Sequence, residues 1–217
     1  MLDQSLCNEP LLAVRDAERR FGDLIVFRAV TFTVPSGRCC AIVGANGAGK
    51  STLLRCIIGS DRLDSGRITV DGIDADETSA RFRKTVAAVC GEIATFAQLT
   101  AHEHLQLVAT AHGVPAAHEI ATRTLASVGL SDAADQLPVT LSSGQRRRLA
   151  LASAFVRPRR LLVLDEPEQH LDPAGRRWLA AAIEAEKRSG TAVVLVSHDP
   201  DIVTAVADDT VDGDTWR

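Results

Sequence analysis

Long apolar runs are absent from this sequence. No run reaches the roughly 18 consecutive apolar residues that a membrane-spanning helix needs, and the first fourteen residues contain no lysine or arginine to begin a signal peptide. The two absences exclude an integral membrane chain and favour a cytosolic one.

Aromatic residues and excess positive charge are also scarce. Aromatic side chains make up only 4% of the chain, and the formal net charge is −4. A nucleic-acid binder that works by a basic face and stacking platforms is therefore not expected. The 46% hydrophobic content of 217 residues is enough to fill the core of one large domain.

The cysteines give no sign of a disulfide framework. Their number, five, is odd. Cys39, Cys40 and Cys56 fall on or beside a predicted buried strand and helix, where free thiols behave as small hydrophobic groups. Neighbouring residues on a strand point to opposite faces, so Cys39 and Cys40 are not expected to form a redox pair.

Apolar runs alternate with helical patterns, which predicts an α/β fold. Strands are expected at Ala29–Val34, Cys39–Val43, Arg67–Val70, Val86–Val89, Leu161–Leu164 and Ala192–Val196. The strand signals stop between Thr100 and Leu137, where a capping-box pattern starts a helix that runs through His112 and a second helix spans Ala116–Val128. We therefore expect one domain over residues 1–217 with an inserted helical subdomain at about 92–157. The acidic tail after Asp208 predicts no element.

Residues 44–51 spell Gly-Ala-Asn-Gly-Ala-Gly-Lys-Ser, which fills every required position of the phosphate-binding loop pattern. The glycines let the backbone N–H groups turn toward an anion, and the next helix adds its positive end. Lys50 supplies a charge, and Ser51 supplies an oxygen suited to Mg²⁺. The predicted nucleotide-binding residues are Gly44, Ala45, Asn46, Gly47, Ala48, Gly49, Lys50, Ser51 and Thr52.

A second motif is an apolar strand that ends in two carboxylates, Asp165 and Glu166. Its end lies at the carboxyl edge of the predicted parallel sheet, where ligands of such folds bind. We expect Asp165 to hold Mg²⁺ through water, and Glu166 to act as general base or to position the water that attacks the γ-phosphate.

The third motif is Leu-Ser-Ser-Gly-Gln at residues 141–145, with Ser142 in an N-cap position. A phosphate loop, a helical insertion, this motif and the Leu-Leu-Val-Leu-Asp-Glu strand together resemble the ATP-binding cassette (ABC) ATPases over nearly the whole chain. The resemblance implies a P-loop NTPase fold of ABC type, with a mainly parallel sheet and an N-terminal antiparallel β portion. It also implies a head-to-tail dimer, in which Ser142, Ser143, Gly144 and Gln145 contact the ATP held by the other subunit.

Three further residues receive roles from this resemblance. Phe21 would stack on adenine, although a core phenylalanine is the alternative. Asp172 would reach across the dimer interface, and Asp172 followed by Pro173 also predicts a helix N-cap and N1 pair. His198, after the last apolar strand, matches the switch histidine that contacts the γ-phosphate and the catalytic carboxylate.

The sequence departs from the family pattern at three places. Glu92 stands near the position of the usual Gln and is the candidate third metal ligand, with one more unit of charge than an amide. Ser143 replaces a glycine of the closing motif. Residues 168–170, Glu-Gln-His, replace the usual small residues before Leu171 and leave a bulkier interface loop.

Two groups of residues receive no function. The histidines His102, His104, His112 and His118 lack the spacing of a usual zinc site and are expected to be solvated or interfacial. The run Arg146–Arg148 is expected to be a solvated helix face.

The resemblance implies an ATPase subunit that uses ATP and Mg²⁺ and works through separate transmembrane subunits at the inner face of the cell membrane. Export is somewhat favoured over import. One alternative is a weakly hydrolysing regulatory switch, suggested by the missing Gln. Another is a soluble cassette protein that acts on ribosomes or DNA, but the chain has neither the second cassette nor the coiled-coil insertion usual in such proteins.

Overall fold

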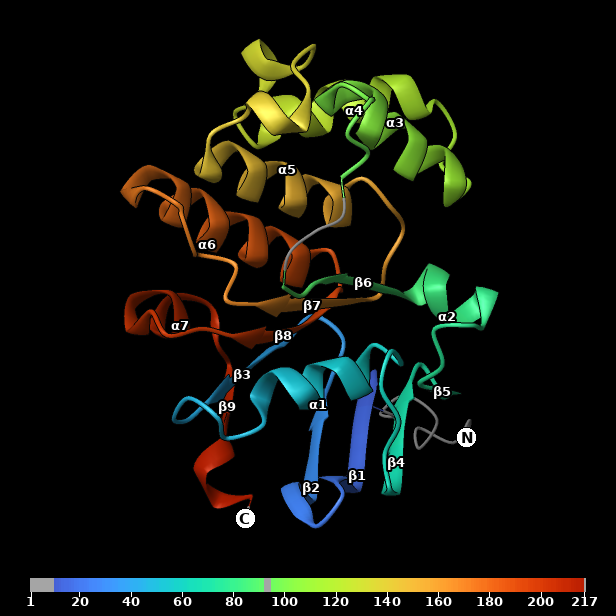
Figure 1. Ribbon diagram of the computed structural model, residues 1–217, viewed down its shortest axis with the longest axis vertical. Helices are drawn as coiled ribbons and strands as arrows, with labels where there is room; N and C mark the ends of the chain where they lie inside the picture. The colour runs from blue at the N-terminus through green and yellow to red at the C-terminus, as the bar shows by residue number, and fades with distance from the viewer. Residues whose placement is uncertain (1–9, 92–94, 217) are drawn as a thin grey trace, which may run out of the picture.

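The computed structural model describes residues 10–91 and 95–216 of the chain. Two sheets organise the described residues (Figure 1). An antiparallel sheet has the strand order β2-β1-β4-β5, and a parallel sheet has the order β6-β7-β8-β3-β9. The predicted α/β class, with its parallel sheet and its N-terminal antiparallel part, is confirmed.

The elements follow one another in an order that interleaves the two sheets. The strands are β1 (Leu12–Phe21), β2 (Leu24–Val34), β3 (Cys39–Val43), β4 (Ser65–Val70), β5 (Ile73–Asp74), β6 (Val86–Val89), β7 (Leu161–Asp165), β8 (Ala192–Val196) and β9 (Asp209–Asp212). The α-helices are α1 (Lys50–Ile57), α2 (Ala80–Thr85), α3 (Ala101–Ala111), α4 (Ala117–Ser127), α5 (Ser143–Phe155), α6 (Pro173–Arg188) and α7 (Pro200–Val206). Short 3₁₀ turns are η2 (Ser131–Ala133), η3 (Pro138–Thr140) and η4 (Gly213–Thr215).

The parallel sheet separates two apolar cores, because neighbouring residues on each strand face opposite sides. On β3, Cys40 and Ile42 pack in the core shared with α1 and the antiparallel sheet. Cys39, from the same strand, packs in the core formed with α5, α6 and α7. The expectation that adjacent cysteines point apart is confirmed, and burial raises the pKa of the four described thiols, Cys39, Cys40, Cys56 and Cys90, to about 12.

The helices α3, α4 and α5 build a third core. Thr100 begins α3 with a complete capping box, in which its hydroxyl accepts from Glu103 N and Glu103 accepts from Thr100 N. Helix α5 also contributes Ala150 and Leu151 to the core against the parallel sheet, so it connects the helical region to that sheet (Figure 1).

The structure contains strands that the sequence analysis did not predict, among them β1 and β9. Strand β1 was not predicted, and the short acidic tail after Asp208 gave no structural signal. The tail forms β9, which pairs in parallel with β3 from Cys40↔Asp209 to Val43↔Asp212. Among the described residues, no helix is long and apolar enough to cross a membrane.

Candidate nucleotide site at the edge of the parallel sheet

The phosphate-binding loop connects β3 to α1, as the sequence predicts. Three of its glycines have positive φ, with values of 130° at Gly44, 82° at Gly47 and 96° at Gly49. A Cβ at Gly49 would lie 3.0 Å from Val26 Cγ1 and 3.2 Å from Val26 O. Glycine is therefore needed there both for the backbone angle and for the close approach of β2.

The positive N-terminal end of α1 is not capped by a side chain. Gly49 provides no side-chain cap, and no acidic residue lies in the first turn. Lys50 is only 6% exposed, and its Nζ donates to Gly44 O at 2.7 Å and Ala45 O at 2.8 Å. The loop thus holds a buried cation beside a helix N-terminus, which is a suitable site for a polyphosphate.

The C-terminal turn η4 also contacts the phosphate loop. Ala45 N donates to Asp214 Oδ1 at 2.8 Å, and Asp214 N in turn donates to Asp212 Oδ1 at 2.9 Å. The adjacent Trp216 packs edge-on against Phe27, and its carbonyl accepts from Arg28 N. Sequence reasoning missed Asp214, because the short acidic tail carries no motif that signals a contact with the phosphate loop.

Asp165 ends β7 close to Ser51 of the loop. Burial raises the pKa of Asp165, and a hydrogen bond from Ser51 opposes that shift. Its Oδ1 is buried and has no hydrogen-bond partner. An uncompensated buried carboxylate oxygen beside a serine hydroxyl fits Mg²⁺, which takes one or two protein oxygens and completes its shell with water and phosphate. No cluster of three or more His, Cys, Asp or Glu residues able to hold a metal occurs in the described ranges.

Glu166 and His198 lie together at the same sheet edge. Glu166 has a φ of 47°, and its backbone N donates to Val196 O at 2.8 Å. The Nε2 atom of His198 is 3.2 Å from Glu166 Oε1, and Gln169 Nε2 donates to Glu166 Oε2. The structure therefore brings the two predicted catalytic side chains into contact.

Arg147 was expected to be solvated, and this was wrong. Its guanidinium donates to the backbone carbonyls of Asp165 at 2.8 Å, Glu166 at 2.6 Å and Pro167 at 3.2 Å. Burial lowers the pKa of this guanidinium. The side chain is drawn inward because its donors bond the carbonyls of three consecutive residues, the last of β7 and the two that follow it. The run of three arginines in the sequence masked this role.

A cavity of about 630 Å³ lies between the carboxylates and the start of α5. Its walls include Ser51, Asp165 and Glu166 on one side and Ser143, Arg146 and Arg147 on the other. Both Gln169 and His170 also line it. The metal candidates Ser51 and Asp165 and the catalytic candidate Glu166 therefore face a common space.

Most of the closing motif lines a second hollow, although its Ser143 lines the cavity just described. Ser142 and Gln145 form a complete capping box at the start of α5, with distances of 2.8 Å and 3.2 Å between side chain and backbone. Ser142, Gly144 and Gln145 line a second hollow together with Asp172 and Arg148. A Cβ at Gly144 would lie 3.0 Å from His170 O, which explains the glycine.

Asp172 is the N-cap of α6, as the Asp-Pro pair predicts. Its Oδ1 accepts from Gly175 N at 2.8 Å and from Arg148 Nη2 at 3.0 Å. The hydrogen bond from Gly175 lowers the pKa of the Asp172 carboxyl. The side chain remains 62% exposed, so it is available to a second surface.

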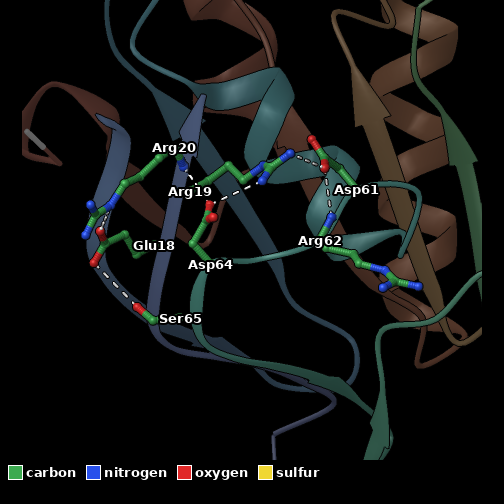
Figure 2. Close-up of polar contacts among 7 residues, drawn as sticks. All are labelled: Glu18, Arg19, Arg20, Asp61, Arg62, Asp64 and Ser65. Atoms are coloured by element: carbon green, nitrogen blue, oxygen red, sulfur yellow. Dashed lines mark hydrogen bonds and ion pairs between the residues drawn. The ribbon is translucent and has the colours of Figure 1, made fainter. Parts of the chain in front are cut away.

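Phe21 lies at the exposed end of β1 and is not a core residue. It is 51% exposed, and the guanidinium of Arg19 lies 4.6 Å from its ring centroid. Figure 2 shows that Arg19 is held by Asp61 at 2.8 Å and Asp64 at 3.2 Å. A fixed cation next to the ring leaves Phe21 as an aromatic surface open to a planar ligand.

The histidines that were expected to be solvated or interfacial differ in their surroundings. His104 was expected to be solvated or interfacial, but it is 2% exposed and bonds Ser153 Oγ at 3.0 Å. The rings of His102 and His118 pack against each other with their centroids 4.5 Å apart. Glu92, the candidate third metal ligand, lies outside the described residues.

The geometry described above is that of a nucleotide-binding ATPase domain, and comparison with known families gives the same class. The ABC transporter family profile matches residues 27–169. The chain belongs to the ABC transporter family, and the prediction of an ABC-type ATPase domain is confirmed at the level of the family.

Relatives and solved structures agree with this assignment. The methionine import ATP-binding protein MetN of Rhizobium johnstonii is 31% identical over 212 residues, which cover 94% of this chain and 59% of that protein. The linearmycin resistance ATP-binding protein LnrL of Bacillus subtilis is 30% identical over 190 residues, 87% of this chain and 61% of that protein. The chain thus spans about three-fifths of the length of these relatives.

Two solved structures share the fold. One, described as the ATP binding subunit of an ABC transporter, superposes with a TM-score of 0.87 at 28% identity, covering 93% of this chain and 85% of the other. The other is cbiO1 of Clostridium perfringens, described as part of the ABC transporter complex cbiONQ. Its TM-score is 0.80 at 25% identity, and it covers 94% of this chain and 85% of its own.

Proposed function

We propose that this chain binds and hydrolyses ATP to power transport through separate transmembrane subunits. The observation that carries the proposal is the convergence of Lys50, Asp165, Glu166 and His198 at one sheet edge. The phosphate loop binds the triphosphate, and the adenine stacks on the exposed ring of Phe21. The expected location is the cytoplasmic face of the membrane, where the chain is held by its permease partner.

Glu166 is the general base, or the positioner, of the attacking water. Its Oε1 lies 3.2 Å from His198 Nε2 and its Oε2 accepts from Gln169 Nε2, so both contacts orient a carboxylate that lines the cavity. Hydrolysis needs in-line attack of the water on the γ-phosphate. The main contribution that a side chain can make to the rate is therefore to orient that water. Mg²⁺, held by Ser51 and Asp165, would neutralise developing phosphate charge.

The two surfaces of the chain support a head-to-tail dimer. Ser142 and Asp172 line a second hollow, which adjoins the cavity of Asp165 and Glu166 at His170. In the dimer, Ser142 and Gly144 of one subunit close on the ATP bound by the other. The direction of transport that we propose is import, because methionine import proteins are among the relatives. The sequence expectation of export has no support among them beyond a resistance protein.

The test is the Mg²⁺-dependent ATPase rate of the purified chain beside Glu166→Gln, with the oligomeric state measured by light scattering. The expected result is turnover by the parent, and an ATP-bound dimer without turnover in the variant. Glu119→Gln, the same change in the first turn of α4, is the matched control and should behave as the parent. Normal hydrolysis by Glu166→Gln would exclude Glu166 as the catalytic carboxylate. ATP binding without turnover in the parent would favour the regulatory switch.

A further inference from the structure

Glu168 is a buried carboxylate that the proposed reaction does not use. It lies in the loop between β7 and α6 and is only 6% exposed. Its Oε1 accepts from Ser197 Oγ at 2.6 Å and from His198 N at 3.1 Å. The other oxygen, Oε2, is buried with no hydrogen-bond partner. Burial of a carboxylate is costly, so a side chain held in this way requires an explanation.

The two partners of Glu168 lie directly after the neighbouring strand, β8. Strands β7 and β8 pair in parallel up to Asp165↔Val196. Glu168 follows the end of β7, and Ser197 and His198 follow the end of β8. The carboxylate therefore connects the segments that leave the two strands, at the edge where Glu166 and His198 meet.

The backbone on both sides of His198 is fixed through this contact. Ser197 is 5% exposed, and its Oγ, besides donating to Glu168, accepts from Asp199 N at 3.0 Å. Asp199 in turn caps α7 by accepting from Asp201 N at 3.0 Å. A continuous set of hydrogen bonds thus runs from Glu168 to the start of α7.

Only the imidazole of His198 is left outside this set. The side chain is 45% exposed, and its Nε2 lies 3.2 Å from Glu166 Oε1. The imidazole can keep a fixed orientation toward Glu166 only if the backbone that carries it is also fixed. The contact from Glu168 to His198 N supplies that constraint directly.

We propose that Glu168 is a positioning residue, which holds the main chain of His198 so that the imidazole meets Glu166. The proposal rests on the proposed function, since it assigns Glu166 and His198 to ATP hydrolysis.

The experiment compares Glu168→Ala with Glu168→Gln in steady-state ATP hydrolysis. The Gln side chain keeps an oxygen that accepts from Ser197 Oγ and His198 N, whereas the Ala side chain keeps none. We expect Glu168→Ala to lower kcat by about 10- to 100-fold, with KM for ATP within about threefold of the parent. Glu168→Gln should retain kcat within about threefold.

A matched control removes another partly buried carboxylate far from the site. Glu186 pairs with Arg159, and its side chain is 13% exposed. Glu186→Ala should lower thermal stability without a selective loss of kcat. If Glu168→Ala does not fold, Glu168→Thr, which is too short to make both contacts, takes its place.

A spectroscopic readout makes the test independent of turnover. In ¹⁵N-histidine-labelled protein, the His198 amide resonance, assigned by its loss in His198→Ala, should move in Glu168→Ala and stay near its parent position in Glu168→Gln. An unmoved resonance in Glu168→Ala would overturn the proposal, as would a kcat equal to that of the parent or a Gln variant as slow as the Ala variant.

The outcomes also separate this inference from the proposed function. If the parent hydrolyses ATP, Glu166→Gln does not, and Glu168→Ala equals the parent, only the positioning role of Glu168 fails. If the parent shows no turnover, the proposed hydrolysis fails, and the His198 resonance alone decides whether Glu168 fixes that segment.

Discussion

The two helices that we assign to the nucleotide begin in opposite ways. Helix α1 starts at a left-handed glycine, Gly49, with no side-chain cap. Helix α5 starts at Ser142 with a complete capping box, so hydroxyl and amide side chains already serve its first turn. A phosphate can therefore approach α1 without displacing any side-chain cap, whereas at α5 it competes with Ser142 and Gln145.

Because of this difference, we expect α1 to act in ATP binding and α5 to act in closure of the dimer. The α1 site is preorganised in a single chain, with Lys50 already buried beside it. The α5 site requires an exchange of hydrogen bonds, which a second subunit carrying ATP would drive. We therefore expect binding to depend on α1 alone and closure to depend on both helices.

The largest expected effect is the loss of the cation at α1. Lys50→Ala should weaken ATP binding on the order of 100-fold, because a buried charge-assisted contact to phosphate is removed. Arg55→Ala, in the last turn of the same helix, is the control and should bind within about twofold of the parent. Titration of the purified single chain with ATP measures both. An unchanged affinity in Lys50→Ala would remove the phosphate-loop assignment.

The next effect comes from giving α1 a hydroxyl at its cap. Gly49→Ser should weaken ATP binding roughly tenfold, because a side chain at positive φ is strained by about 1–2 kcal/mol and its Cβ meets Val26 at 3.0 Å. Gly113→Ser is the control, with a similar φ of 72° and nothing within 4 Å. It should lose stability but not affinity. Equal affinity in both variants would show that α1 does not need its uncapped start.

A smaller effect is expected when the cap of α5 is removed. Ser142→Ala and Thr100→Ala each break a capping box and should each lower the free energy of unfolding by about 1 kcal/mol. Only Ser142→Ala should also weaken the ATP-bound dimer trapped by Glu166→Gln, by roughly tenfold, with ATP affinity of the single chain unchanged. Light scattering across a concentration series measures the dimer. If both variants weaken it equally, the serine acts only through helix stability.

The smallest effect concerns the carboxylate that holds the phosphate loop. Asp214→Asn retains an oxygen for Ala45 N but removes a negative charge near the triphosphate. We expect ATP to bind about two- to threefold more tightly at low ionic strength, with the gain shrinking as salt is added. Asp132→Asn, in the exposed turn η2, is the control. A loss of affinity in Asp214→Asn would show that the charge itself stabilises the loop.

The sequence predicted the elements whose burial pattern is simple. The runs at β6, β7 and β8 are apolar throughout and were found within one residue, and the caps at Thr100 and Ser142 were visible as spaced residue pairs. Strand β1 was missed because register shifts between Val14 and Arg20 break its alternation. Strand β9 was missed because it has only four residues, two of them aspartates.

The site was predictable where a fixed run of residues signals one role, as in the phosphate loop at residues 44–51. It was not predictable where the role depends on what the backbone leaves unpaired. Arg147 is directed by the carbonyls of Asp165, Glu166 and Pro167 where β7 ends, and Glu168 by a serine hydroxyl and a backbone amide that follow the neighbouring strand. Neither set of partners is close in sequence, so no local pattern signals them.

The position of β3 has a consequence for how the chain folds as it is synthesised. This strand carries the phosphate loop, and its two neighbours in the sheet are β8 and β9, which come from the last part of the chain (Figure 1). During translation, residues 39–43 therefore remain without a sheet partner until residues 192–212 have left the ribosome. The nucleotide pocket is among the last parts to form, and ATP can stabilise only the finished domain, not a nascent one.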